Sequence, residues 1–166
     1  MKDNYFIGIY WGVRKEGIDN CADKISTTLN LLSSLDESFG TWYRTTRPRK
    51  GEVLQSLNVN KEGIKSILLK AQNRNDLGEL LEDLGYTFSI KSENNYSQAH
   101  VLSFSCGIFF DKIPNCVTLN IGKNKAYEHL TSNDFLRRVC AVLSEVWEPD
   151  KTVIRCNDNA CLTNKR

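Results

Sequence analysis

The uncharged segment YFIGIYW, at residues 5–11, constrains the fold more than any other part of the sequence. Six of its seven residues are aromatic or β-branched. A run of this composition is typical of a strand in the middle of a sheet, with apolar material on both faces. Gly8 interrupts the run, and a glycine within a strand often marks a close approach by another backbone or by a helix. We therefore expect residues 5–11 to form a central strand around which the other elements are arranged.

Segments with apolar residues at intervals of three and four predict three helices. Two are long, one at residues 18–35 and one from about Ser132 to Trp147, where Pro149 ends the pattern. A shorter helix is expected after Asn60, whose side chain can cap the first turn. Each helix has one apolar face, so we expect the helices to pack on the sheet.

Alternation of apolar and polar residues predicts strands at 86–91, 102–108 and 117–121, and a short last strand is expected at 152–156. The resulting order, β-α-α-β-β-β-α-β, lacks the regular alternation of strand and helix that a parallel sheet requires. We therefore predict an α+β fold: an antiparallel or mixed five-stranded sheet, with the helices packed mainly on one face.

The length of 166 residues fits a single domain over residues 1–166, in which residues 157–166 form a frayed polar tail. The first four residues lead directly into the first strand, without the basic and apolar regions of a signal peptide. No apolar segment approaches the length of about 18 residues that a membrane helix needs. We expect a cytoplasmic protein that does not contact a membrane.

The charge balance limits the kind of partner. The sequence has 22 basic and 20 acidic side chains, a formal net charge of +2. A protein that binds nucleic acid normally carries a marked basic excess or a basic stripe. We therefore expect no direct nucleic-acid partner, and any electrostatic partner surface must be local.

Two local acidic clusters stand out. The denser one is Glu79, Glu82 and Asp83, and the weaker one is Glu148 and Asp150. The first is expected on the polar side of a short helical turn at 77–84, which Gly85 closes. Catalytic carboxylates need a cleft and a facing partner, and no histidine or cysteine accompanies these. Two interpretations remain open, a solvated face and a patch that binds a partner protein.

The segment at 36–59 lacks periodicity and carries aromatic residues followed by basic ones. They include Phe39, Trp42, Tyr43, Arg44, Arg47 and Arg49. Aromatic and basic residues together could bind single-stranded nucleic acid by stacking and by phosphate contacts. Alternatively, the aromatic residues cap the core beneath the first helix while the arginines stay solvated. We favour the second interpretation, because the two types are grouped rather than interleaved. Tryptophan is enriched at interface hot spots, so Trp11, Trp42 and Trp147 are possible interface anchors. Each also lies on or beside an apolar stripe, and we expect Trp11 and Trp147 to pack in the core.

The cysteines do not predict a metal site. No pair has C-x-x-C spacing, and only Cys156 and Cys161 lie near each other. Cys21, Cys106 and Cys140 each fall on the apolar face of a predicted element, where a thiol behaves as a small hydrophobic side chain. We expect no metal and no cofactor.

The two histidines, His100 and His129, stand alone in the sequence. Neither has a ligand or a nucleophile nearby, so we expect both at the surface. Without a nucleophile and a base, the sequence does not predict an enzyme.

Seven short motifs occur in order across nearly the whole chain. They are Tyr10-Trp11-Gly12-x-Arg14-Lys15-Glu16 followed by Cys21-Ala22, then Trp42-Tyr43, Asn73-Arg74-x-Asp76, Glu82-Asp83-Leu84-Gly85-Tyr86, Ser105-Cys106-Gly107 and Trp147-Glu148-Pro149-Asp150. Together they resemble the immunity protein 52 family, the antidotes of bacterial polymorphic toxins. The resemblance implies a small cytoplasmic protein, encoded beside a toxin, that inhibits this cognate protein toxin by binding. Some members of that family are paired with nuclease toxins of restriction-endonuclease type delivered by type VI secretion.

If the toxin is a nuclease, its active groove is positively charged, and an inhibitor of near-zero net charge needs a local acidic patch to meet it. The two acidic clusters are therefore our candidates for toxin binding. A nucleic-acid-binding module that uses residues 44–50 is the alternative function. A small hydrolase that uses the carboxylates near Glu82 is a third, against which the missing nucleophile and base already count.

Overall fold

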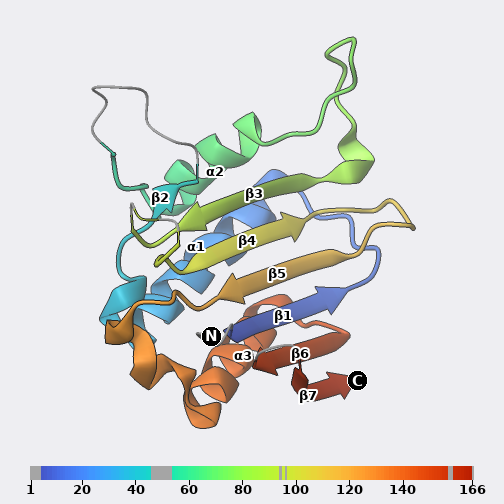
Figure 1. Ribbon diagram of the computed structural model, residues 1–166. Coiled ribbons are helices and arrows are strands. Elements are labelled where there is room, and N and C mark those ends of the chain that lie inside the picture. Colours follow the sequence, from blue (N-terminus) through green and yellow to red (C-terminus); the bar gives the residue numbers. More distant parts are fainter. Residues whose placement is uncertain (1–4, 46–53, 94, 96, 157–158, 166) are drawn as a thin grey trace.

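The computed structural model describes residues 5–45, 54–93, 95, 97–156 and 159–165. It has one antiparallel sheet of seven strands in the order β2-β3-β4-β5-β1-β6-β7 (Figure 1). The strands are β1 (Tyr5–Trp11), β2 (Tyr43–Arg44), β3 (Tyr86–Lys91), β4 (Val101–Cys106), β5 (Asn115–Asn120), β6 (Lys151–Cys156) and β7 (Asn159–Lys165). The helices are α1 (Ile18–Leu35), α2 (Lys61–Lys70) and α3 (Asn133–Trp147), with 3-10 turns η1 (Glu37–Phe39), η2 (Glu82–Leu84) and η3 (Lys125–Thr131).

The predicted α+β class is confirmed, since the sheet is antiparallel throughout and the three α-helices lie on one of its faces (Figure 1). The sheet has seven strands rather than five. The two additional strands lie at its edges, where β2 pairs with β3 and β7 pairs with β6. A two-residue strand is too short to produce an alternating pattern. Residues 159–165, expected to fray, form β7 because main-chain hydrogen bonds to an open sheet edge do not require apolar side chains.

Strand β1 lies between β5 and β6, as expected for a central strand. Its residues Ile7, Ile9 and Trp11 are buried. On its other face a Cβ atom at Gly8 would lie 2.7 Å from Tyr10 Oη and 2.9 Å from the Phe6 ring. The close approach at this glycine is therefore made by two aromatic side chains, not by a backbone or a helix. The expectation of an apolar layer on both faces is wrong, because in the described residues these rings cover the strand in place of a second layer.

Two of the helices begin at capping side chains, and the cap at Asn60 is the one that the sequence predicts. Asn60 Oδ1 accepts a hydrogen bond from Gly63 N (2.8 Å), and Ser132 Oγ accepts one from Phe135 N (3.3 Å). Gly63 lowers the helix propensity of α2, but a Cβ atom there would lie 2.3 Å from Asn58 O. The glycine lets the segment before the helix fold back against its first turn.

The tryptophans are core residues. Trp11 and Trp147 stack with their ring centroids 5.2 Å apart, and Trp147 Nε1 donates a hydrogen bond to Thr28 Oγ1 (2.9 Å). Trp42 is also buried, and its ring stacks on Phe39 at 6.1 Å. The prediction that Trp11 and Trp147 pack in the core is confirmed. None of the three is exposed enough to anchor a partner.

The expectation that His100 lies at the surface is wrong. Its side chain is fully buried, and its ring centroid lies 4.0 Å from that of Tyr127 and 4.7 Å from that of Phe39. Both neighbours come from turns far away in the sequence, so no local pattern could reveal the burial. His129 is exposed as expected, but it is not alone, because its Nε2 lies 2.8 Å from Asp36 Oδ2.

We expect the titration of His100 to lower the free energy of unfolding by about 1.5 kcal/mol between pH 6.5 and pH 5. Burial lowers the pKa of His100 to about 4, although nearby Asp36 opposes this shift and His129 adds to it. Below pH 6.5 the unfolded chain binds a proton at this imidazole while the folded protein does not, so acid favours unfolding. Urea denaturation at several pH values measures the slope.

The control variant for this pH dependence is His129→Gln. The hydrogen bond with Asp36 raises the pKa of His129, so its contribution to stability is present in acid and is lost as the pH rises. Removing it must therefore leave the acid-induced loss of stability in place. A variant whose stability is flat between pH 6.5 and pH 5 would contradict the assignment to His100.

Candidate functional site

Connecting segments converge at the end of the sheet where β1 and β4 finish and β3, β5 and β6 begin (Figure 1). They are residues 12–17 between β1 and α1, 71–85 between α2 and β3, 107–114 between β4 and β5, and 148–150 between α3 and β6. We call this surface the loop end. It is our candidate functional site, because the two predicted acidic clusters both lie on it.

Asn115, the first residue of β5, holds two of these loops together. Its Oδ1 accepts a hydrogen bond from Ile108 N (2.8 Å), and its Nδ2 donates to Ile108 O (2.9 Å) and to Gly12 O (2.7 Å). The side chain is fully buried. A single amide therefore hydrogen-bonds main-chain groups of residues 12–17 and of residues 107–114, and those of Ile108 are buried.

The weaker acidic cluster is attached to the same region. Asp150 Oδ2 accepts a hydrogen bond from Gly12 N (2.9 Å), and the Arg14 guanidinium donates to Trp147 O (2.7 Å) and Glu148 O (3.0 Å). Glu148 has a left-handed backbone (φ 47°) that ends α3 and turns the chain toward β6. The Asp150 carboxylate is thus already engaged by the main chain of Gly12. The Glu148 side chain is the carboxylate of this pair that is more available to a partner.

The denser acidic cluster lies partly on a hairpin rather than on the expected helical turn at 77–84. Only Glu82–Leu84 is helical, as η2, while Arg74 and Leu80 form a β-bridge that closes the loop between them. Asn75 Oδ1 accepts hydrogen bonds from the main chain of Leu77 (3.0 Å) and Glu79 (2.9 Å). This asparagine turn competes with helix formation, which explains why the prediction of a longer turn is wrong.

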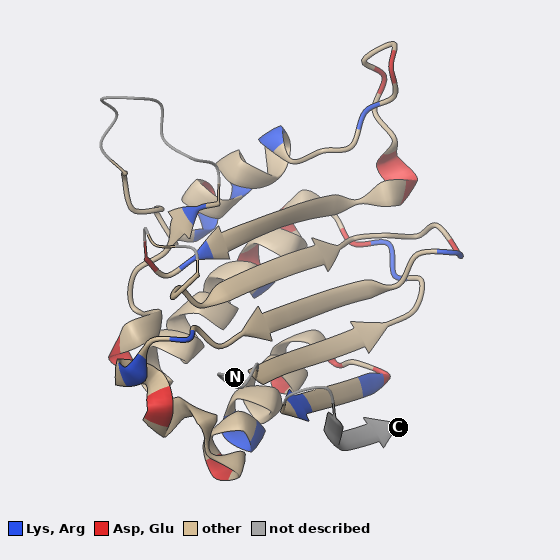
Figure 2. Ribbon diagram, in the orientation of Figure 1, with Lys and Arg blue, Asp and Glu red and all other residues tan. Residues whose placement is uncertain are grey.

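Acidic residues lie along the segment before β3 (Figure 2). Their carboxylates differ in their surroundings. Glu79 Oε2 accepts a hydrogen bond from Asn75 Nδ2 (2.7 Å). Asp83 is half-buried, and its carbonyl oxygen accepts hydrogen bonds from the main chain of Phe109 and Phe110. Glu82 is exposed, and its carboxylate makes no hydrogen bond or ion pair within the described part of the chain. It is therefore the carboxylate most available to a partner.

Exposed apolar side chains gather on the loop end, a feature that the sequence did not suggest. Of the five large hydrophobic residues exposed in the described ranges, four lie here, with 41% to 85% of their surface accessible: Val13, Leu77, Leu80 and Ile113. Exposed apolar and charged side chains at the same end of a protein are features of surfaces that bind other proteins. Periodicity could not place them together, because they come from separate loops.

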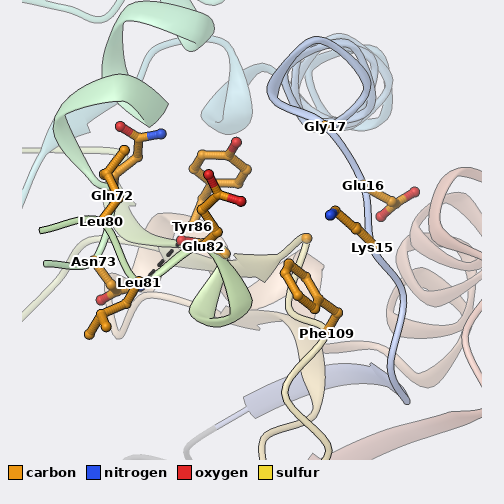
Figure 3. A pocket seen from close by; sticks show the side chains of 12 residues that line it. Lys15, Glu16, Gly17, Gln72, Asn73, Leu80, Leu81, Glu82, Tyr86 and Phe109 are labelled. Carbon is orange, nitrogen blue, oxygen red and sulfur yellow. Dashed lines mark hydrogen bonds between the residues drawn. The ribbon is translucent and has the colours of Figure 1, made fainter.

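The loop end also contains a cavity of about 260 Å³ (Figure 3). Its lining includes Leu80, Leu81, Glu82, Tyr86 and Phe109. Lys15, from the loop before α1, extends toward it from the other side (Figure 3). The site therefore combines a hollow with the free carboxylate of the denser cluster.

The alternative binding loop is only partly described. Trp42 and Phe39 are buried, which confirms that they cap the core and rules out base stacking by Trp42. Tyr43 is half-buried in β2 and Arg44 is exposed beside it. Arg47 and Arg49 lie outside the described residues.

The contact between Ser38 and His100 does not have the geometry of a catalytic pair. Gly122 N donates a hydrogen bond to His100 Nδ1 (2.9 Å), so in the neutral ring the proton resides on Nε2. Nε2 then donates to Ser38 Oγ, 3.2 Å away, and has no lone pair with which to remove the serine proton. His100 therefore links η1, through Ser38, to the segment that follows β5, through Gly122.

Within the described ranges, no group of three or more His, Cys, Asp or Glu side chains is placed to hold a metal ion. Cys21 and Cys106 are buried free thiols, as their apolar pattern predicts, whereas Cys140 is half-buried. A hydrogen bond with Cys21, together with burial, raises the pKa of Cys106 well above its usual value. Among the helices described, none is long and apolar enough to span a membrane.

Comparisons with known proteins give one family and one fold. The family model described as immunity protein 52 matches residues 3–162. No curated protein matches the chain. Among solved structures, Pseudomonas aeruginosa T6SS protein PA0821 is similar, with a TM-score of 0.51 and 11% identity over 93% of this chain. The match covers 40% of that protein's chain, and at this identity the likeness concerns the fold alone.

Proposed function

Since the chain belongs to the immunity protein 52 family, we propose that it protects its producer by binding one cognate protein toxin. We propose further that this toxin is a nuclease, of restriction-endonuclease type, delivered by type VI or a related secretion system. The description of the structural neighbour as a T6SS protein supports the delivery route. The protein acts as a cytoplasmic inhibitor and not as an enzyme.

The observation that carries the proposal is the composition of the loop end. Two acidic clusters, exposed apolar side chains and a cavity lie on one surface, whereas the net charge of the whole chain is only +2. A nuclease presents a basic groove to the phosphates of its substrate. A local acidic surface that also carries apolar side chains can occupy this groove and exclude the nucleic acid.

The hydrogen bonds between the loops favour tight binding. An antidote must stay bound to a lethal enzyme throughout growth, which requires a nanomolar dissociation constant, a binding free energy of about −12 kcal/mol. Such a complex typically buries roughly 1,600 Å² of surface. Asn115 and Arg14 join the segments of the loop end to one another before any partner arrives. A preorganised surface loses less conformational entropy on binding, so more of its contact energy appears as affinity.

We expect protection to be stoichiometric. Increasing amounts of this protein, added to a fixed amount of toxin, should reduce nuclease activity linearly until the two are equimolar. Toxin recovered from the complex by denaturation and refolding should regain full activity, because binding leaves its covalent structure intact. Mass spectrometry of the recovered toxin is the decisive measurement, since cleavage or modification would mean that the protein is an enzyme.

A further inference from the structure

The cavity of the loop end is lined on one side by the loop before α1 and on the other by the segment between α2 and β3 (Figure 3). Tyr86 and Phe109 provide aromatic rings, and Leu80 and Leu81 add aliphatic surface from the hairpin. The volume of about 260 Å³ admits one long side chain but not a folded element. The cavity is thus suited to a single anchoring residue of a partner.

The charges around the cavity are incompletely paired. The Glu16 side chain is almost fully buried, and its Oε1 accepts hydrogen bonds from Lys24 and Asn20. The Lys24 ammonium pairs its charge, although its buried Oε2 has no hydrogen-bond partner in the described residues. Glu82 is the other carboxylate of the lining, and it has no such partner in the described residues. The Lys15 ammonium lies 4.8 Å from the centroid of the Phe109 ring and forms no ion pair with a carboxylate in the described residues. The protein therefore already places one cation against the aromatic wall.

We infer that this cavity is the subsite for one arginine side chain of the partner, an inference that rests on the proposed function. The guanidinium would replace the Lys15 ammonium on the Phe109 ring and donate hydrogen bonds to the Glu82 carboxylate. An arginine fits better than an aromatic guest, because an aromatic ring would cover Glu82 without satisfying it. It also fits better than a lysine, since the planar guanidinium stacks on rings and binds a carboxylate with two donors.

The inference makes an unusual prediction for Lys15. Lys15→Met should tighten toxin binding by about 5-fold, because the arginine no longer has to displace a cation from the ring. The matched control is Lys112→Met, which removes the same charge from the loop end at a residue that does not line the cavity. If charge alone mattered, the two variants would tighten binding equally, and the inference would be wrong.

Two further variants should weaken the toxin complex. Glu82→Gln and Phe109→Leu are each expected to raise the dissociation constant by about 10-fold, since one removes the anion and the other the aromatic ring. The control is Asp111→Asn, which neutralises a carboxylate of the loop end outside the cavity. Calorimetry at one ionic strength measures all the affinities.

A titration without toxin tests the cavity independently. The probe is Nα-acetyl-L-arginine methylamide, added to the isotopically labelled protein, and the readout is the amide resonances of Gly85 and Gly107, which line the cavity. We expect saturable shifts with a millimolar dissociation constant, at least about 5-fold weaker for the neutral citrulline analogue and for Glu82→Gln.

The two proposals fail in different ways. A tight toxin complex that is indifferent to Glu82→Gln, Phe109→Leu and Lys15→Met, or equal shifts with the citrulline analogue, would overturn the arginine subsite and leave the proposed function standing. Failure to bind or inhibit the toxin would overturn the proposed function, and the arginine titration would then decide on the cavity alone.

Discussion

Replacing Glu79 and Glu82 together by lysine should lower the affinity for the toxin by about 100-fold or more. Both side chains are exposed, so the free energy of unfolding should change little. In the complex each lysine would face the positive groove of the proposed nuclease. Removing one partner of a charge pair that binding buries costs about 2–5 kcal/mol, and reversing the charge adds repulsion. Association should also become slower and less sensitive to salt.

The matched control reverses two glutamates outside the loop end. Glu62 lies in the first turn of α2 and Glu128 in η3, and both are exposed. Glu62→Lys with Glu128→Lys changes the net charge by the same amount. It therefore distinguishes the loss of contacts at the loop end from a long-range effect of the net charge on toxin binding. Calorimetry at two salt concentrations measures both double variants. Equal losses in the two variants would mean that the toxin does not bind at the loop end.

The nucleic-acid hypothesis predicts that the basic residues after Arg44, and not the acidic clusters, make the functional contacts. Reversing Arg47 and Arg49 should leave the toxin complex nearly unchanged if the loop end is the binding surface. If the protein binds nucleic acid, the same variant should lose that binding, and the slope of affinity against salt should flatten. A toxin affinity that depends on these arginines and not on Glu79 and Glu82 would transfer the site to this loop.

Replacing Asn115 by alanine should lower the free energy of unfolding by about 3–5 kcal/mol. The substitution leaves Ile108 N, Ile108 O and Gly12 O without the hydrogen bonds that the amide makes. Each buried group that loses its partner costs about 1–3 kcal/mol, and the small cavity left by the amide adds to this cost. Urea denaturation measures the loss, and the toxin affinity of the folded fraction shows whether the loop end has also lost its preorganisation.

Asn120 provides the control on the same strand. It is half-buried on the face of the sheet opposite the helices, and its side chain makes no hydrogen bond in the described structure. Asn120→Ala should therefore cost less than about 1 kcal/mol and leave toxin binding unchanged. If the two variants lose the same stability, Asn115 does not have the special role that its three hydrogen bonds indicate.

The sequence by itself determined the elements whose evidence is local. The apolar stripe at residues 18–35 gives α1 with the same bounds, Asn60 caps α2 as predicted, and α3 begins after Ser132, near where its stripe was expected to begin. The alternation at 86–91 likewise gives β3 without change. These predictions succeed because the period of a helix or a strand is recorded in neighbouring residues, and burying one face of each element is enough to select the α+β class.

Only the tertiary structure decided which loops and side chains from distant parts of the chain lie together. The hydrogen bond from Gly12 to Asp150 joins residues 138 positions apart, and that from Asn115 to Gly12 joins residues 103 apart. Such contacts bring the two acidic clusters and the exposed apolar side chains to one end of the sheet, and the packing of distant turns buries His100 in the same way. No window of sequence contains both partners of these contacts, because strand order and loop position depend on which edges pair, and that is settled by the packing of the whole chain.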